Sequence, residues 1–349
     1  MLALCPNNNE VWIYQNVGGE WTKKWTLKEV SRRPKGGLSK TLQPWMIGHT
    51  STANHRHPAP PLSVFALQHD FLVSGIDWHP VTNKIVTCSH DRNAFVWDLD
   101  KTKNEWKATV VIAGLDRAAI TVKWSPDGKK FAIASSNKNV VQCWFDTSGN
   151  WYINSVLKKE KAKSTCKSSA VSIAWHPNGQ VLAIGSTDYR CRVVFAYLPP
   201  TDGVEGGGPG PTPQPFADPA DAPETGDVLA EWEMTKAWVN DAQWSPSGNS
   251  LAFVGHDGLL HVTSFKPSED GIQVATVKTN SLPGMCLLWL SERALVVAGH
   301  SMNPVIFACS APGATDWKFV GAADAKVSTN PTCPDNDSCR AVSPLLMIL

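Results

Sequence analysis

The chain has 349 residues, a formal net charge of +1, 42% hydrophobic residues and 18% charged residues, a composition typical of a globular protein. This charge creates no overall field for nucleic acid or an anionic membrane. The nine cysteines contain no C-x-x-C pair, which argues against a zinc site or a secreted disulfide framework. There is also no apolar run near the roughly 18 residues of a membrane helix, and no signal peptide is expected.

The first predicted strands lie in ALCPNNNEVWIY (3–14) and WTKKWTLKE (21–29). Residues 30–68 follow, rich in Pro, Ser and basic residues and without a sustained period, so we expect a disordered insert. Three histidines in it have no ligand geometry for a metal, and four basic residues have no fold to form an anion site. These residues are His49, His55, His57, Arg32, Arg33, Lys35 and Lys40.

One pattern then recurs five times. A strand ending in tryptophan, as in SGIDWHP (74–80), is followed by three short β-branched or aromatic runs separated by turn residues. The five tryptophans are Trp78, Trp124, Trp175, Trp244 and Trp289. Four strands per repeat of about 40–50 residues predict an all-β fold, the WD-repeat β-propeller. We expect five full blades and part of a first, hence an incomplete ring. The Pro/Gly-rich stretch 199–226 lengthens one interval and is expected to be a loop.

The segment CSHDRNAFVWDL (88–99) resembles a catalytic cluster. In a WD blade, however, an Asp in the turn between the second and third strands forms a hydrogen-bonded network. Its partners are a Ser or Thr two residues earlier, a Trp six residues later and a His before the blade. Asp91, Ser89, Trp97 and His69 fall at these positions. We therefore predict a structural network that makes the blade rigid.

Other repeats lose parts of this set, which suits a structural role. Asp188 follows Ser186 but has Val194 at the tryptophan position, and Asp257 follows Gly255. A catalytic triad needs a nucleophile and a base at an exposed site, and the pattern indicates none. We expect no enzyme, and no catalytic, cofactor-binding or metal-ligating residues.

Several stretches resemble the WD-repeat subunit of the actin-related protein 2/3 complex. The most specific part is DRNAFVW (91–97), followed one blade later by RAA before the next inner strand (117–119). The resemblance covers most of 1–29 and 69–320. It implies a seven-bladed, non-catalytic scaffold that supports nucleation and branching of actin filaments. The implied partners are other subunits of the complex, actin and nucleation-promoting activators, in a hetero-oligomer. The implied location is the cytoplasm and cytoskeleton, at actin patches or the cell cortex.

The resemblance also implies a basic surface facing other subunits and activators, formed by Arg92, Arg117, Lys158 and Lys159. The sequence departs from the family after Lys159 and at Asn240, where the family usually has His. Two alternatives remain: a generic WD-repeat scaffold or substrate adaptor outside actin regulation, and an enzyme. The motif RAA favours the actin-related family over a generic propeller.

The expected domain is a propeller over 1–324, interrupted by 30–68 and 199–226, with a non-family tail at 325–349. In the family Glu29 would join His69 directly. Val30-Ser31 can be encoded by a splice-donor sequence and Gln68 by a splice-acceptor end, and a second pair, Val327-Ser328, lies where the resemblance ends. We therefore hypothesise that both segments are translated intron. The alternative is a genuine lineage-specific loop and tail.

Overall fold

The computed structural model describes residues 2–5, 8–27, 69–146, 149–156, 166–203, 224–233, 236–265, 272–279 and 282–323. The predicted insert at 30–68 and the predicted tail at 325–349 lie outside these residues. The described part of the chain contains no helix that is long and apolar enough to cross a membrane.

The described residues form six antiparallel sheets in chain order. The first sheet has three strands, β1 (Leu2–Leu4), β2 (Val11–Val17) and β3 (Glu20–Leu27). The second has β4 (Val73–Trp78), β5 (Ile85–Ser89), β6 (Ala94–Asp100) and β7 (Glu105–Val111). The third has β8 (Ala119–Trp124), β9 (Lys130–Ser135), β10 (Val140–Phe145) and β11 (Trp151–Ser155).

The remaining three sheets repeat the same four-stranded order. The fourth has β12 (Ala170–Trp175), β13 (Val181–Ser186), β14 (Cys191–Phe195) and β15 (Val228–Trp232). The fifth has β16 (Val239–Trp244), β17 (Ser250–Gly255), β18 (Leu259–Ser264) and β19 (Gln273–Lys278). The sixth has β20 (Gly284–Ser291), β21 (Ala294–Gly299), β22 (Val305–Ala308) and β23 (Lys318–Ala322). The prediction of a WD-type propeller architecture is confirmed.

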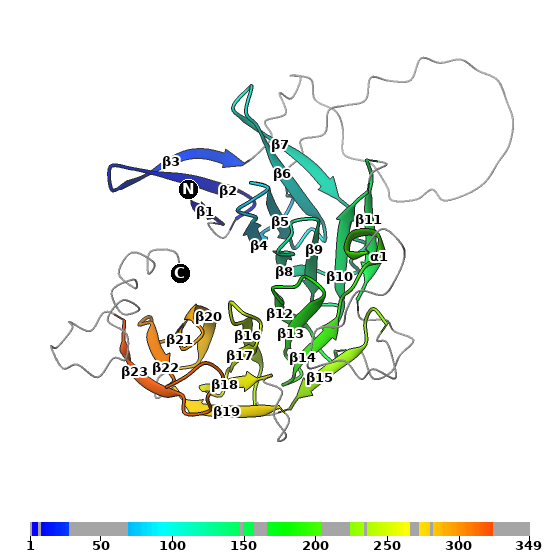
Figure 1. The fold of residues 1–349 in the computed structure, drawn as a ribbon. Helices are drawn as coiled ribbons and strands as arrows, with labels where there is room; N and C mark the ends of the chain where they lie inside the picture. Colours follow the sequence, from blue (N-terminus) through cyan, green and yellow to red (C-terminus); the bar gives the residue numbers. More distant parts are fainter. Residues whose placement is uncertain are drawn as a thin grey trace, which may run out of the picture.

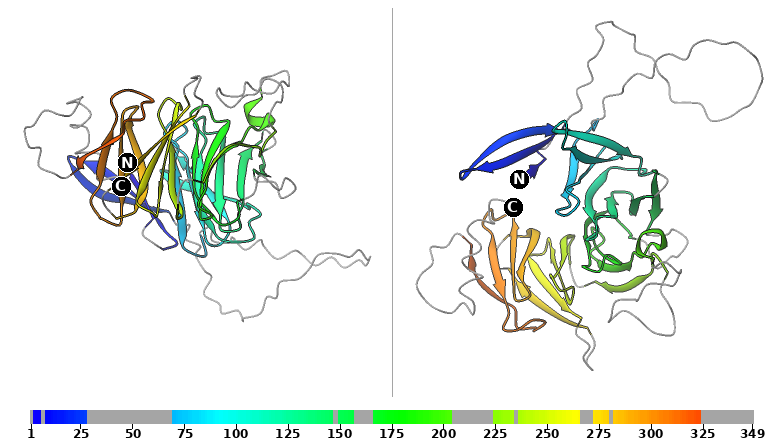
Figure 2. Two further views of the ribbon diagram at one scale, coloured as in Figure 1. Left: turned by 90° about the horizontal axis from the view of Figure 1, so that it is seen from below. Right: turned by 45° about the horizontal axis from the view of Figure 1, so that its top comes forward.

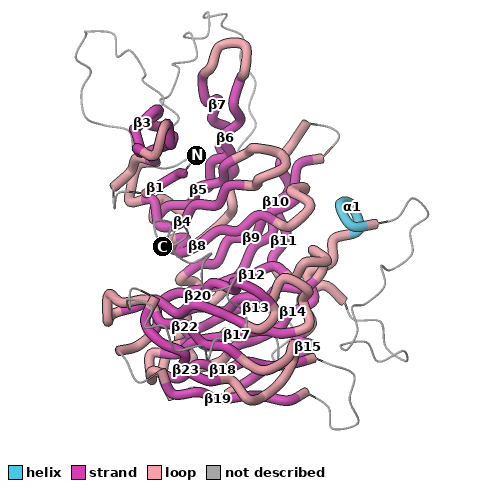
Figure 3. Tube along the Cα trace, turned by 60° about the vertical axis from the view of Figure 1, so that its left-hand side comes forward, coloured by secondary structure: helices cyan, strands magenta, loops and turns pink. Residues whose placement is uncertain are grey.

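The sheets follow one another around an open arc (Figure 1), and the turned views show the same succession (Figures 2 and 3). The strands β4, β8, β12, β16 and β20 line the inner side, and β7, β11, β15, β19 and β23 lie outermost. Among the described residues, no strand pairs the first sheet with the sixth.

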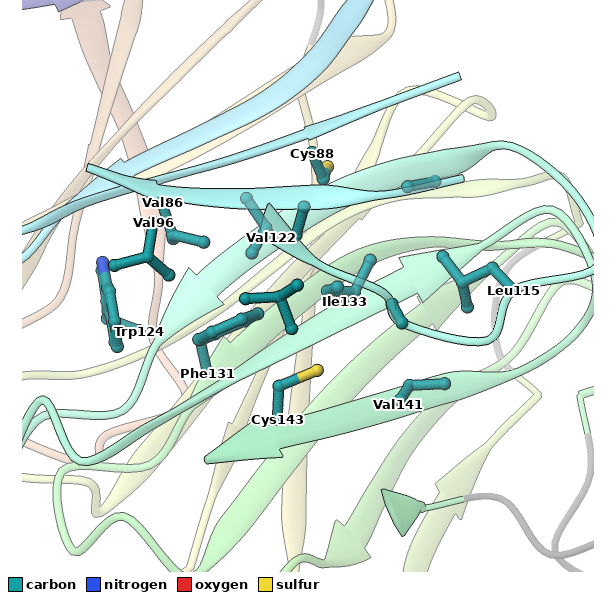
Figure 4. Close-up of a cluster of buried hydrophobic side chains, with 14 residues drawn as sticks. Val86, Cys88, Val96, Leu115, Val122, Trp124, Phe131, Ile133, Val141 and Cys143 are labelled. Atoms are coloured by element: carbon teal, nitrogen blue, oxygen red, sulfur yellow. The ribbon is translucent and has the colours of Figure 1, made fainter. Parts of the chain in front are cut away.

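Apolar side chains between consecutive sheets hold the arc together. One buried cluster joins the second and third sheets, where Val86 and Val96 meet Val122, Phe131 and Ile133 (Figure 4). Four further clusters fill the other contacts between consecutive sheets. Because both faces of an internal blade are covered in this way, its second strand is buried along its whole length, as in β5, β9, β13 and β17.

The inner strands approach one another closely enough to require a small residue. A Cβ atom added to Gly75 on β4 would lie 2.9 Å from the Cα atom of Thr121 on β8. Glycine is therefore needed where these two backbones meet.

The stretch 199–226 is not a loop throughout, contrary to the prediction. Pro199–Asp202 form a short helix, α1, at the outer margin of the arc (Figure 3). The ammonium group of Lys130 is fully buried beside the carboxylate of Asp202. This ion pair explains why the helical turn forms against the third sheet.

Candidate interaction site

A buried chain of four polar side chains lies under the turn between β5 and β6. His69 Nδ1 lies 2.7 Å from Asp91 Oδ2, and His69 Nε2 lies 2.9 Å from Thr87 Oγ1. Trp97 Nε1 donates to the same Thr87 hydroxyl oxygen at 3.0 Å. All four side chains are nearly inaccessible to solvent.

The donors in this network assign its protons. The indole of Trp97 can only donate, so the Thr87 hydroxyl oxygen accepts from it and also bonds His69 Nε2. The Asp91 carboxylate can only accept. His69 Nδ1 then carries a proton and donates to Asp91. Burial alone raises the pKa of Asp91, but the hydrogen bond and charge of His69, with the backbone amides of Asn93 and Asp70, lower it below the usual value.

Ser89 takes part in this turn through bonds to backbone groups, and the Trp97 indole donates to Thr87 and not to Asp91 or Ser89. The Ser89 hydroxyl donates to the Phe71 carbonyl at 3.1 Å and accepts the Asp91 amide at 3.2 Å, which closes the turn. Thr87 pairs directly with Phe95 and is the diagonal neighbour of Trp97 across the two strands. A threonine in the middle of the otherwise apolar run IVTC was the available signal for it.

The fourth sheet keeps the carboxylate of this network and replaces the imidazole. Arg192, only 1% exposed, donates to both carboxylate oxygens of Asp188 at 3.0 and 2.8 Å. Its Nε lies 2.9 Å from Glu231, and Cys166 lies 3.6 Å from its Nη1. In the second sheet the Asp91 carboxylate also accepts the backbone amide of Asp70. In the fourth sheet the Asp188 carboxylate accepts the backbone amide of Lys167, which likewise lies in the loop before the blade.

The same turn has one residue with a positive φ in each complete blade, and this residue is exposed in every blade except at Gly258, which is buried. Arg92, Lys138, Tyr189, Gly258 and Met302 occupy this position, all with φ between 56° and 72°. The side chains of Arg92 and Lys138 are exposed on neighbouring sheets, and Arg117 is exposed on the loop leading into β8. We call these three residues the basic turn surface. Sequence inspection missed Lys138, although its turn, SSNKN (135–139), aligns with SHDRN (89–93). Lys158 and Lys159 lie outside the described residues.

Polar groups on the inner side of the arc connect neighbouring sheets. A cavity of about 460 Å³ there is lined by the anchor tryptophans Trp78, Trp124, Trp175 and Trp244. Asp77 at its wall accepts the Trp124 amide at 2.8 Å and lies 3.3 Å from the Lys123 ammonium group. These contacts of Asp77 hold β4 and β8 together. Among the residues that the structure describes, no three His, Cys, Asp or Glu side chains are grouped to hold a metal.

The WD domain, G-beta repeat family matches residues 61–98 and 159–194, which contain the Asp91 and Asp188 turns. The chain is thus a WD-repeat protein built as a β-propeller. It is 33% identical over 322 residues to actin-related protein 2/3 complex subunit 1B of Arabidopsis thaliana, covering 92% of this chain and 69% of that protein. It is 32% identical over 308 residues to actin-related protein 2/3 complex subunit 1A-B of Xenopus laevis, covering 88% of this chain and 68% of that protein. The chain belongs to the actin-related protein 2/3 complex subunit 1 family.

Subunit 1 of Schizosaccharomyces pombe is 34% identical over 261 residues, which cover 74% of this chain and 65% of the yeast protein. A plant, a frog and a yeast are therefore represented among these similar proteins. The resemblance inferred from DRNAFVW and RAA is confirmed.

Proposed function

We propose that this chain is a non-catalytic scaffold subunit of an actin-related protein 2/3 complex, and that it supports nucleation and branching of actin filaments through protein contacts. The observation that carries this proposal is family membership across most of the chain. The described geometry is compatible with a scaffold, because the polar groups considered above satisfy one another within and between blades.

Contacts with the complex and its activators are proposed to involve the basic turn surface together with Lys158 and Lys159. Arg92 and Lys138 point outward from adjacent rigid turns, and Arg117 lies on the loop beside the second of these turns, where its carbonyl accepts the Ser135 hydroxyl at 3.4 Å. Exposed charges at an interface rim mainly steer association and are sensitive to salt. A partner with acidic residues opposite this surface would bind faster at low ionic strength. The proposed location is the actin cytoskeleton in the cytoplasm.

Co-expression with the other subunits of the complex tests the scaffold function. The tagged chain should co-purify with them, and the assembled complex should increase actin polymerisation when an activator is present. A generic scaffold or adaptor outside actin regulation would co-purify with none of these subunits.

Charge reversal tests the surface separately. Glutamate is introduced at Arg92, Arg117, Lys138, Lys158 and Lys159, and the matched control carries glutamate at five other exposed lysines, Lys101, Lys103, Lys107, Lys278 and Lys318. The first variant should lose subunits or activator from the pull-down, and the control should retain them. Equal retention by both variants would reject the assigned surface and leave the scaffold function standing.

A further inference from the structure

A hydrogen bond between two side chains ties the turn between β9 and β10 to the loop before β8. Asn137 Nδ2 donates to Asp116 Oδ2 at 2.6 Å, across 21 residues of sequence. The second, fourth and fifth sheets have a tie at the same spacing, but there the turn aspartate accepts a backbone amide, that of Asp70, Lys167 or Lys236. Of these four ties, the one in the third sheet is made by two side chains, so a substitution can remove it.

Each member of this pair directly precedes an exposed cation of the basic turn surface. Arg117 follows Asp116 on the loop, and Lys138 follows Asn137 in the turn. The hydrogen bond between Asp116 and Asn137 therefore sets the spacing between the two backbone positions that carry these cations. Within the part of the chain that the structure describes, neither cation has an ion-pair partner. Both charges are thus available to a partner molecule.

Further hydrogen bonds fix the backbone around Lys138. The amide and the hydroxyl of Ser136 both donate to the Ala118 carbonyl, at 3.0 and 3.3 Å. On the other side of the turn, the Ser155 hydroxyl of β11 donates to Asn139 Oδ1 at 2.7 Å. Lys138 itself has a φ of 62°, a conformation that few residues other than glycine adopt. The turn therefore presents Lys138 from a backbone that is held on both sides.

The same hydrogen bond governs the charge beside the two cations. Asp116 is exposed next to Arg117, and without a partner its carboxylate would be free to pair with Arg117 or Lys138 and cancel that charge. Asn137 engages this carboxylate and is itself neutral. In the second sheet the equivalent turn position, just before Arg92, carries the charged residue Asp91.

We propose that Asp116 and Asn137 are positioning residues, which hold Arg117 and Lys138 as a paired binding site for carboxylates of an acidic segment in a partner protein. This inference rests on the proposed role of the basic turn surface in partner contacts. Two cations at a fixed spacing lose less conformational freedom on binding than two cations on independently moving loops. The cations supply the attraction, and the hydrogen bond supplies the geometry.

Binding of a fluorescently labelled oligoglutamate peptide to the full chain at low ionic strength tests the positioning role. Asp116→Ala removes one negative charge, so charge alone predicts tighter binding of the peptide. Positioning predicts binding that is weaker by about threefold, because an exposed hydrogen bond contributes at the low end of the usual range. Asp70→Ala is the matched control, since it removes the same charge from the equivalent loop of the second sheet, where the tie uses the backbone amide. This control should bind the peptide at least as tightly as the unchanged chain.

Exchange of the two partners supplies the rescue. Asn137→Ala should weaken binding by a similar factor although the net charge does not change. The double variant Asp116→Asn with Asn137→Asp reverses donor and acceptor, keeps the net charge and should restore binding. All variants should keep the melting temperature of the unchanged chain.

Four results would overturn the proposal: no measurable binding by the unchanged chain, equal or tighter binding by Asp116→Ala, a double variant that binds no better than the single variants, or a loss of binding that follows a fall in melting temperature. Each of them would leave the scaffold function standing, because co-purification with the other subunits tests that function separately.

Discussion

Lys130 of β9 donates a hydrogen bond from its ammonium group to the carbonyl oxygen of Ala196, 3.1 Å away at the end of β14 in the next sheet. The same carbonyl accepts the side-chain amide of Gln142 at 2.9 Å. The ammonium group also pairs with Asp202 and lies 5.0 Å from the ring centre of Trp175. Burial lowers the pKa of Lys130, and the opposite charge of Asp202 counters that effect. One lysine thus joins the third sheet to the fourth and to α1.

Replacing Lys130 by methionine should destabilise the fold strongly. The substitution fills the space but leaves the Asp202 carboxylate, 7% exposed, without its counter-charge. Removing one partner of a buried pair costs about 3–5 kcal/mol. Urea unfolding of Lys130→Met, with Lys107→Met as the exposed control on β7, measures this loss. The double variant with Asp202→Asn should lose less than the sum of the single losses, and full additivity would contradict the proposed coupling.

Thr87→Val should also destabilise the chain although the shape of the side chain hardly changes. The missing hydroxyl leaves buried His69 Nε2 and Trp97 Nε1 without their shared partner. An unsatisfied buried group costs about 1–3 kcal/mol. Chemical denaturation gives the difference, and Thr109→Val, at an exposed position on β7, should stay within about 0.5 kcal/mol of the unchanged chain. Wild-type stability of Thr87→Val would show that the network contributes little.

Much of the fold could be predicted from the sequence because its determinants are local. Four inner strands end in a tryptophan, and β20 continues two residues beyond Trp289. A turn and an apolar strand follow each of them, so the repeat located β4, β8, β12, β16 and β20. The Asp91 turn could be recognised for the same reason, since its partners Ser89 and Asn93 lie within two residues.

The missed residues depend on contacts between distant parts of the chain. Lys130 occurs in the turn-like sequence DGKK, which resembles a solvated surface, and its burial depends on Asp202 of α1, which is 72 residues away in the sequence. Arg192 stands in an apolar strand, and its charge is balanced by Asp188 nearby and Glu231 on the outer strand. Hydrophobic patterning cannot indicate that a charge is buried when its partner comes from another element.

Stability should fall in acid because of the two turn carboxylates. Burial raises the pKa of Asp188, but its hydrogen bonds from Arg192 and the Lys167 amide lower it overall, as His69 does for Asp91. A carboxylate whose pKa is lower in the folded than in the unfolded chain stabilises the fold above its usual pKa. This contribution disappears as the pH falls through the folded value. We therefore expect the free energy of unfolding to decrease below about pH 4.

Denaturation of Asp91→Asn across the same pH range checks the assignment. This variant should show a smaller decrease in acid, because one of the two titrating carboxylates is gone. Asp98→Asn, whose side chain is 59% exposed, serves as the control and should keep the full pH dependence. If the free energy of unfolding of Asp91→Asn kept the full pH dependence, groups other than Asp91 would cause the loss of stability in acid.

Excision of residues 30–68 should preserve the fold if the intron hypothesis is right. Leu27, at the end of β3, and Val73, at the start of β4, belong to the same buried cluster, and Asn9 donates to the His69 carbonyl at 3.3 Å. Leu27 and Val73 therefore belong to one core, and a short connection from Glu29 to His69 suits this packing. Shortening a connection reduces the entropy cost of closing it, by about 0.6 kcal/mol for each halving of its length. The excised chain should melt at a higher temperature.

A matched deletion of residues 31–69 has the same length but replaces His69 by Val30 and breaks the bond to Asp91, so this variant should melt at a lower temperature. Gene sequencing should show splice-donor codons at Val30-Ser31 and CAG at Gln68. Loss of folding after excision of 30–68, or abundant mature message that contains the segment, would identify it as a genuine part of this chain.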